Sequence, residues 1–142
     1  IMQMDEGMDT GDILHSVSLP IGDEDTAGSL FAKLAELGSA TLTEAVSRLK
    51  KGQLRATKQD AASATSASML TKEQGHLDWF GSARALHCLI RGLDPWPSAY
   101  SFLEGKRFRF FKPLVIEGPV TERPGTLCRA DKDGLLIATG KN

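Results

Sequence analysis

The spacing of apolar residues at the start of the chain predicts two short strands on either side of an acidic loop. Apolar and polar positions alternate over residues 1–4 and, imperfectly, over residues 13–19. The loop between them contains glycines, which permit tight turns. It also holds four carboxylates within eight residues, namely Asp5, Glu6, Asp9 and Asp12. This pattern is typical of a hairpin with an acidic connection.

Two stretches after the acidic loop show helical periodicity. Apolar residues recur every three or four positions over residues 27–37 and again over residues 39–51. A glycine comes after each stretch, and glycine commonly ends a helix because it adopts the left-handed conformation without strain. We therefore expect two helices, the first ending at Gly38 and the second at Gly52.

Residues 54–71 have few large apolar side chains and cannot anchor a hydrophobic core. We expect this stretch to be a linker between two folding units, residues 1–53 and residues 72–142. A short helix over its run of alanines is the alternative interpretation.

The second unit is expected to begin with a helix that is capped by Ser82 and buries Leu86, Leu89 and Ile90. A turn with two prolines follows this helix and holds Trp96 between them. We expect the Trp96 ring to be a buried anchor under the turn, and stacking on a nucleic-acid base is the alternative.

From residue 99 onward the apolar period changes to two, which predicts short strands. A hairpin is expected over residues 99–113, with its turn at Glu104-Gly105. Its second strand would send Phe108 and Phe110 to the core, and the alternating arginines to solvent. Three further strands are expected at residues 114–116, 125–130 and 135–139. About five short strands after one helix suggest a small barrel of the oligonucleotide-binding (OB) type.

The composition is that of a globular protein, with 41% hydrophobic and 25% charged residues. Every apolar run is shorter than the ~20 residues that a membrane-spanning helix needs. Cys88 and Cys128 lie far apart and form no Cys-x-x-Cys pair. We therefore expect reduced, buried thiols in a cytoplasmic protein, and neither a disulfide framework nor a zinc site.

Charge is distributed unevenly along the chain, although the net charge is −1. Residues 1–36 hold eight acidic side chains against one basic side chain, a balance of −7. Residues 37–142 hold the other sixteen basic side chains against ten acidic ones, a balance of +6. Because a basic surplus attracts polyanions, nucleic acid is a candidate partner of the second part.

The acidic loop has two interpretations. Clustered carboxylates repel one another, and one reason to keep them together is a catalytic acid or base that is tuned by its neighbours. The other interpretation is a hydrated loop without chemistry. Residue types alone leave both open.

Four blocks of sequence resemble the methionyl-tRNA formyltransferases, which belong to the folate-dependent formyltransferase family. The first block is Gln3-Met-Asp-Glu-Gly-Met-Asp-Thr-Gly-Asp-Ile-Leu14, and the second is residues 26–38. The others are Met69-Leu-Thr-Lys-Glu-Gln-Gly-His-Leu-Asp-Trp79 and Ile90-Arg-Gly-Leu-Asp-Pro-Trp-Pro-Ser-Ala99. They occur in the family's order and at suitable spacing, which makes the resemblance more specific than any single motif.

The resemblance implies a chain of α/β and β class. Residues 1–53 would be the C-terminal part of a nucleotide-fold (Rossmann-like) formyltransferase domain. Residues 54–71 would be the interdomain linker, and residues 72–142 an incomplete OB-like β-barrel that binds tRNA. Neither end looks like a natural terminus, so we expect an internal fragment without the family's catalytic asparagine, histidine and Ser-Leu-Leu-Pro folate loop. Such a fragment would be inactive by itself.

The reaction that the resemblance implies is transfer of a formyl group from 10-formyltetrahydrofolate to the amino group of methionyl-initiator-tRNA. It would run without a metal, in the cytoplasm, and in a monomer. By motif match, Asp9 is the catalytic aspartate. The folate pocket would be lined by the preceding residues, Asp5, Glu6, Gly7 and Met8. Contacts with tRNA are expected from a basic set consisting of Lys72, Arg91, Lys106, Arg107 and Arg109.

Two other functions remain open at this point. A sugar-nucleotide formyltransferase would share the Asp9-Thr10-Gly11 loop, because the same chemistry acts there on a different amine. A non-catalytic nucleic-acid-binding module would keep the basic strand and use the acidic loop only as structure.

Overall fold

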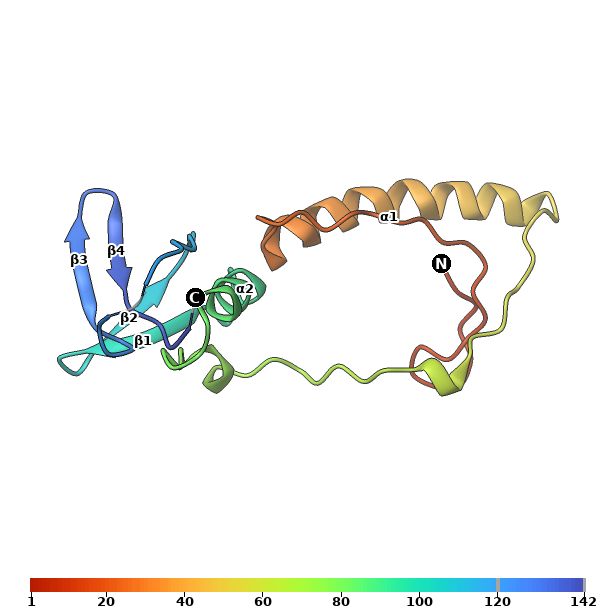
Figure 1. The fold of residues 1–142 in the computed structure, drawn as a ribbon. Helices are drawn as coiled ribbons and strands as arrows, with labels where there is room; N and C mark the ends of the chain where they lie inside the picture. The colour runs from red at the N-terminus through yellow and green to blue at the C-terminus, as the bar shows by residue number, and fades with distance from the viewer. Residues whose placement is uncertain (120, 142) are drawn as a thin grey trace. The chain divides into compact units, whose positions relative to one another are not determined.

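The computed structural model describes residues 1–119 and 121–141, which divide into two compact units (Figure 1). The first unit comprises Ile1–Asp23 and Ser29–Ser68. The second comprises Glu24–Gly28 and the chain from Met69 onward. The second unit is therefore discontinuous in sequence, because five residues from the first part of the chain belong to it.

A single helix, α1 (Ala27–Lys50), occupies the region where the sequence predicted two helices. The predicted break at Gly38 is wrong. Gly38 is exposed, and no atom lies within 4 Å of the position that a Cβ would take, so no contact forces the chain to turn there. The good helix formers on both sides outweigh the ~1 kcal/mol that a glycine costs in a helix interior. The second predicted end is confirmed, because α1 stops at Lys50 and Gly52 takes a φ of 67°.

The segments on either side of the acidic loop are extended but pair at single positions only. Met2 pairs with Ile13, and Ile13 pairs on its other side with Thr57, both antiparallel. The continuous hairpin predicted over residues 1–4 and 13–19 is therefore wrong in extent. Its pairing ends at His15, whose backbone N donates to Ile1 O at 3.2 Å, because the following residues find no strand partner in the described part of the chain.

Most apolar side chains of α1 are exposed, although their spacing is that of an amphipathic helix. Only Thr41 and Ala45 of this helix are buried, and Phe31 is 76% exposed. The described residues of the first unit supply one long helix, one 3-10 turn at Ala61–Ser63 and extended segments, so they provide no second layer for this face. No described helix, α1 included, combines the length and the apolar character needed to cross a membrane.

The hydrophobic core lies in the second unit, between α2 (Ala83–Gly92) and β1 (Ala99–Leu103). Ser82 caps α2 as predicted, because its hydroxyl oxygen accepts a hydrogen bond from Ala85 N at 3.2 Å. The predicted buried face of the helix is also confirmed. The core consists of Leu77, Leu86, Ile90 and Ala99, with Trp79, Leu89 and Phe110 packed against it.

Three predictions of burial are wrong. Phe108, predicted to face the core, is 42% exposed. Trp96 is 58% exposed, because the turn buries Pro97 and Ser98 in its place. Cys88 and Cys128 are free thiols as expected, but both are exposed. In α2 the side chains of Leu86 and Ile90 occupy the buried face, and Cys88 points away from it.

The first predicted hairpin is confirmed. β1 pairs antiparallel with β2 (Lys106–Phe110), and Leu103 lies opposite Lys106. The turn residues Glu104 and Gly105 have φ values of 49° and 75°. Two left-handed residues make the kind of turn that matches the twist of the flanking strands.

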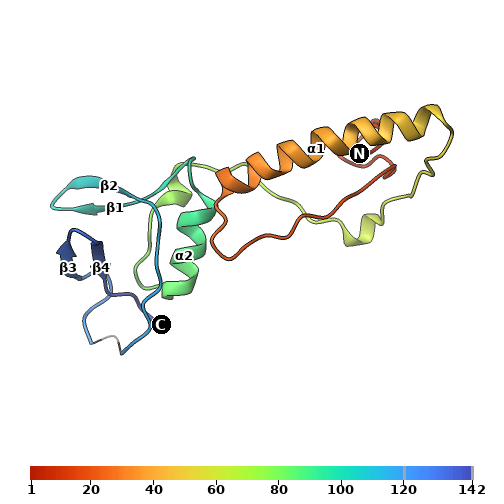
Figure 2. The ribbon, with the colours of Figure 1, turned by 90° about the horizontal axis from the view of Figure 1, so that it is seen from above.

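The second hairpin is formed by β3 (Leu127–Asp131) and β4 (Gly134–Ile137), as predicted. Residues 114–116 form no strand, so that prediction is wrong. Pro113, just before them, offers no N–H to a ladder, and Leu114 is 82% exposed. The two hairpins are separate two-stranded sheets (Figure 2). The described residues therefore form a fold of mixed helix and strand and no closed barrel.

The glycines of α1 allow a direct test of its continuity. Gly38→Ala is expected to raise the free energy of unfolding of α1 by about 0.5–1 kcal/mol, because alanine is the better helix former where no contact opposes it. Gly52→Ala is the matched control and should destabilise by roughly 1 kcal/mol, since a Cβ is strained at positive φ. Urea unfolding followed by circular dichroism measures both. A destabilising Gly38→Ala would contradict an unbroken helix.

Candidate functional site

The acidic loop, residues 5–12, is folded by its own first carboxylate. Asp5 Oδ1 accepts hydrogen bonds from Gly7 N at 3.0 Å and from Thr10 Oγ1 at 2.5 Å. A side chain that bonds the backbone two residues ahead builds a local turn. A Cβ at Gly7 would collide with the Thr10 hydroxyl, so this turn requires glycine. Asp5 and Gly7, both predicted for the folate pocket, thus give the loop its shape.

Asp9, the predicted catalytic residue, is exposed on this loop. Its φ is 57°, in the left-handed region that aspartate tolerates better than most residues. The side chains of Glu6 and Met8 are exposed as well. An exposed loop with a left-handed residue keeps one conformation only where its surroundings hold it.

The side-chain amide of Gln59 holds the loop in place. Gln59 Nε2 donates to Asp9 O at 2.8 Å and to Gly11 O at 2.7 Å. These two carbonyls flank Thr10, so one primary amide fixes the turn that contains Asp9. Gly11 is buried, and it approaches the carbonyl of Gln3 so closely that a Cβ would collide with it.

Gln59 is positioned by the residues around it. Thr57 N donates to Ile13 O, and Ile13 N donates to Thr57 O, each at 2.8 Å. Asp60 caps the short helix η1 (Ala61–Ser63) by accepting from Ser63 Oγ at 2.6 Å and from Ala62 N at 3.0 Å. The Ser63 hydroxyl first, and the Ala62 amide second, lower the pKa of Asp60 from its usual value. Gln59 therefore lies in the chain between Thr57, which pairs with Ile13, and the turn η1, which is capped by Asp60.

No local pattern in the sequence identifies Gln59. It lies in residues 54–71, whose small and polar composition indicates a linker. Its hydrogen-bond acceptors are 50 and 48 positions away along the chain. The one local signal is Asp60, a favoured capping residue before the small side chains of η1.

Four of the five predicted RNA-binding cations are exposed side chains of the second unit. Lys106, Arg107 and Arg109 belong to β2, and Lys72 precedes the short helix η2 (Glu73–Gly75). The guanidinium carbon of Arg107 lies 3.8 Å from the centroid of the Tyr100 ring. β2 therefore carries three exposed cations, of which Arg107 and Arg109 lie on the same face of the strand.

Arg91, the fifth cation of that set, is engaged inside the second unit. Its Nη1 donates to Asp25 O at 2.6 Å, and its Nε donates to His87 Nδ1 at 3.3 Å. The carboxylate of Glu24 lies 3.6 Å from His87 Nε2, and Gly28 N donates to Asp94 O at 2.9 Å. These contacts fasten residues 24–28 to α2 and to the turn after it.

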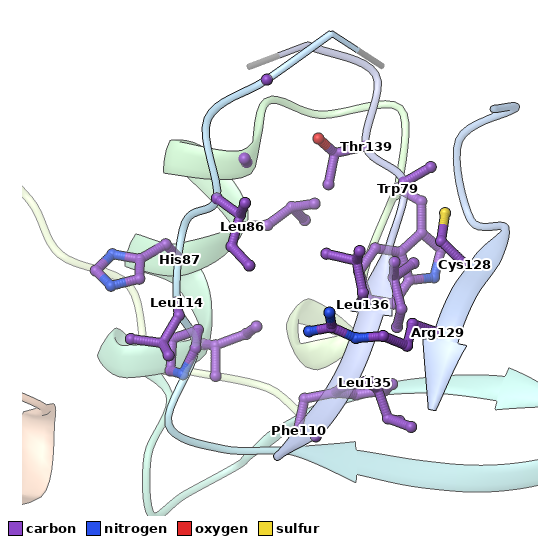
Figure 3. Close-up of a pocket in the computed structure, with 18 of the residues that line it drawn as sticks. Trp79, Leu86, His87, Phe110, Leu114, Cys128, Arg129, Leu135, Leu136 and Thr139 are labelled. Atoms are coloured by element: carbon purple, nitrogen blue, oxygen red, sulfur yellow. The ribbon is translucent and has the colours of Figure 1, made fainter. Parts of the chain in front are cut away.

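The second unit also contains an apolar cavity of about 730 Å³ beside α2 and β4 (Figure 3). The labelled side chains of Leu86, Phe110, Leu135 and Leu136 line it. Of all the predicted site residues, only Arg109 is part of the lining. The predicted chemistry therefore lies outside this cavity.

Two family sequence models match the chain. The model described as "Formyl transferase" matches residues 1–46, and the model described as "Formyl transferase, C-terminal domain" matches residues 69–142. The second match covers more than half of the chain. The chain belongs to the formyl transferase family. The resemblance found in the sequence is thereby confirmed.

Curated relatives of the chain carry the name methionyl-tRNA formyltransferase. The protein of Desulfotalea psychrophila is 58% identical over 142 residues, which cover 99% of this chain and 44% of that protein. The proteins of Caldanaerobacter subterraneus subsp. tengcongensis and Marinobacter nauticus are 43% and 41% identical, and each match covers 99% of this chain and 45% of the relative. The chain thus spans less than half the length of these relatives.

Solved structures with a similar fold include those of HypX from Aquifex aeolicus. A HypX variant matches 98% of this chain and 25% of its own with a TM-score of 0.73 at 20% identity. HypX in complex with tetrahydrofolic acid matches 98% of this chain and 24% of its own, also with a TM-score of 0.73 at 20% identity. At this identity the likeness concerns the fold.

The Gln59 contacts predict how the acidic loop responds when the amide is removed. Gln59→Leu keeps the size of the side chain but removes both donors, which should cost the loop about 1–3 kcal/mol. Backbone ¹⁵N order parameters of residues 8–11 in the 142-residue chain should fall. Gln53→Leu, an exposed glutamine outside these contacts, is the control and should leave them unchanged. Equal order parameters in both variants would show that the amide does not hold the loop.

Proposed function

We propose that this chain supplies the aspartate loop and the tRNA-binding unit of an enzyme that formylates methionyl-initiator-tRNA with 10-formyltetrahydrofolate as donor. The names of the curated relatives, at 58%, 43% and 41% identity over nearly the whole chain, support this reaction most directly. The tetrahydrofolic acid complex of HypX, which has a similar fold, supports a folate donor. The relatives' names do not favour a sugar nucleotide as acceptor.

The chemistry requires that an amine lose a proton while it attacks the formyl carbon, and that the formyl oxygen accept negative charge. The Asp9 carboxylate would orient and charge-stabilise an imidazole and help to carry the proton through a water, as buried carboxylates do in other acyl-transfer sites. His15, His76 and His87 lie outside the family's histidine motif, so we assign that imidazole to none of them.

The loop residues before Asp9 divide into two roles in this proposal. Glu6 and Met8, whose side chains are exposed, would contact the folate donor. Asp5 and Gly7 would keep the loop in the conformation that allows these contacts, through the hydrogen bonds that Asp5 accepts. None of these roles requires a metal ion, so the proposal includes none.

The second unit would bind tRNA through its cations. Lys72, Lys106, Arg107 and Arg109 would approach phosphates, since each is exposed. Arg91 would act indirectly, by holding residues 24–28 against α2. The proposal further assigns residues 1–53 to a Rossmann-like domain and residues 72–142 to an OB-like barrel, in a cytoplasmic monomer. The two hairpins and α2 agree in order with that β-domain.

The experiment that tests the proposal replaces the matching region of the Desulfotalea psychrophila relative with this 142-residue sequence. The chimera is expected to formylate methionyl-initiator-tRNA. Asp9→Asn in the chimera should reduce kcat at least about 100-fold, because the amide keeps the shape but loses the charge that an imidazolium needs. Affinity for the tRNA should stay the same.

Asp12→Asn is the matched control, since it removes a carboxylate from the same loop at a position to which the motif match assigns no catalytic role. It should keep most of the turnover. A chimera that binds methionyl-tRNA but never formylates it would favour a non-catalytic binding module. Equal losses in Asp9→Asn and Asp12→Asn would show that net loop charge matters and that Asp9 has no special role.

A further inference from the structure

One face of the β1–β2 hairpin combines aromatic rings and arginines on its solvent side. In the antiparallel register Tyr100 lies opposite Arg109, and Phe102 lies opposite Arg107. Side chains alternate across a strand, so these four point to the same side. The other side of the hairpin carries Ala99, which is fully buried in the core. The hairpin therefore has one face for the core and one outer face.

A third ring extends this outer face. His76 forms a parallel bridge with Tyr100, and their rings are stacked with centroids 5.3 Å apart and planes 28° apart. Phe102 meets the Tyr100 ring edge-on at 5.8 Å and the His76 ring at 5.9 Å. We name the set His76, Tyr100, Phe102, Arg107 and Arg109 the aromatic–arginine face.

The rings on this face are available to a ligand. Phe102 is 56% exposed, and His76 is exposed as well. Scattered exposed apolar side chains are ordinary, but a contiguous cluster flanked by charge marks an interaction surface. Because the core already takes the opposite side of the hairpin, packing within the described chain does not account for this cluster.

The arginines are available too. Within the described residues neither Arg107 nor Arg109 lies within ion-pair distance of a carboxylate. The Arg107 guanidinium carbon lies 3.8 Å from the centroid of the Tyr100 ring, in a cation–π contact. A ring uses none of the N–H donors of the guanidinium, so they remain able to bind an anion bidentately.

We propose that the aromatic–arginine face binds an unpaired nucleotide of RNA, with its base stacked on Phe102 and its phosphates on Arg107 and Arg109. Exposed rings beside cations suit single-stranded nucleic acid. Each base offers a π-face that can stack on a ring, and each backbone phosphate offers a negative charge that a cation can bind. Paired bases are stacked on one another, so only a loop, bulge or end presents such a face. The inference rests on the proposed function, in which the RNA is the tRNA substrate.

The test measures binding of the 142-residue chain to a short single-stranded RNA that carries 2-aminopurine, and to a duplex of the same length. The single strand should bind more tightly, and its 2-aminopurine fluorescence should be quenched. Phe102→Ala should weaken its affinity about 5- to 150-fold, the range for losing one base stack. The slope of log Kd against log salt should not change, because no charge is lost. Phe80→Ala, a 65% exposed phenylalanine of the same unit, is the matched control and should have no effect.

Two further variants keep the test decisive if Phe102→Ala perturbs the hairpin. Phe102→Leu retains apolar volume but lacks a ring face and should also weaken RNA binding. Phe102→Trp keeps a ring face and should bind RNA as tightly as the native chain.

The arginines are tested through the salt dependence of binding. Arg107→Gln and Arg109→Gln should each reduce the salt slope by about 0.7, the value for one phosphate contact on a single strand. Lys132→Gln, in the turn between β3 and β4, is their control.

Several results would overturn the inference. The first is that Phe102→Ala and Phe80→Ala weaken the affinity for single-stranded RNA equally. The second is that the chain binds the duplex as tightly as the single strand. Self-association of the chain that Phe102→Ala abolishes without changing RNA affinity would assign the face to a second copy of this chain. The outcome for the proposed function is distinct. If the chimera formylates methionyl-tRNA and Phe102→Ala leaves its tRNA affinity unchanged, the proposed function stands and the role of this face is contradicted. Quenching that depends on Phe102, without formylation by the chimera, would support this face and reject the proposed function.

Discussion

The two hydrogen bonds that Gln59 donates to the carbonyls of Asp9 and Gly11 are the constraint on which the candidate site depends. Four carboxylates within eight residues repel one another, so the loop needs donors to keep a fixed shape. A primary amide supplies two donors without adding charge. A lysine or arginine in its place would add a positive charge to the loop. The neutral clamp therefore fixes the backbone and leaves the charge of the loop intact.

The second unit achieves order in a different way, by packing. A small core, centred on Leu86 and Ile90 of α2, takes one side of the β1–β2 hairpin and leaves the other side to solvent. The contacts of Arg91 and His87 add residues 24–28 to this unit, so its stability depends on a segment that is distant in sequence. The loop of the first unit depends in the same way on Gln59.

Sequence patterns predicted the features whose causes lie within a few residues. The Ser82 cap, the Glu104-Gly105 turn and the buried face of α2 each follow from local chemistry. The predictions of a helix break at Gly38 and of a buried Trp96 were wrong, because neighbouring residues decide both. Helix formers on both sides of Gly38 outweigh one glycine, and Pro97 is buried in place of Trp96. The motif match predicts Asp9 as the catalytic residue, but Gln59, which holds its loop, lies in a stretch with the composition of a linker. Contacts across about fifty residues leave no local signal.

The partners of three arginines show why sequence alone could not separate binding cations from structural ones. Arg91 donates to a backbone carbonyl, and Arg129 Nε lies 2.9 Å from a carboxylate oxygen of Asp131, so both have used donors within the chain. Arg107 has an aromatic ring as its partner. The ring attracts the cation but accepts no hydrogen bond from the N–H groups in the guanidinium plane. In each case the charge is the same, but among these three arginines only Arg107 keeps all five N–H donors unused by the described residues. The chemistry of the partner, more than the number of basic residues, therefore determines how many N–H donors each arginine keeps for an anion.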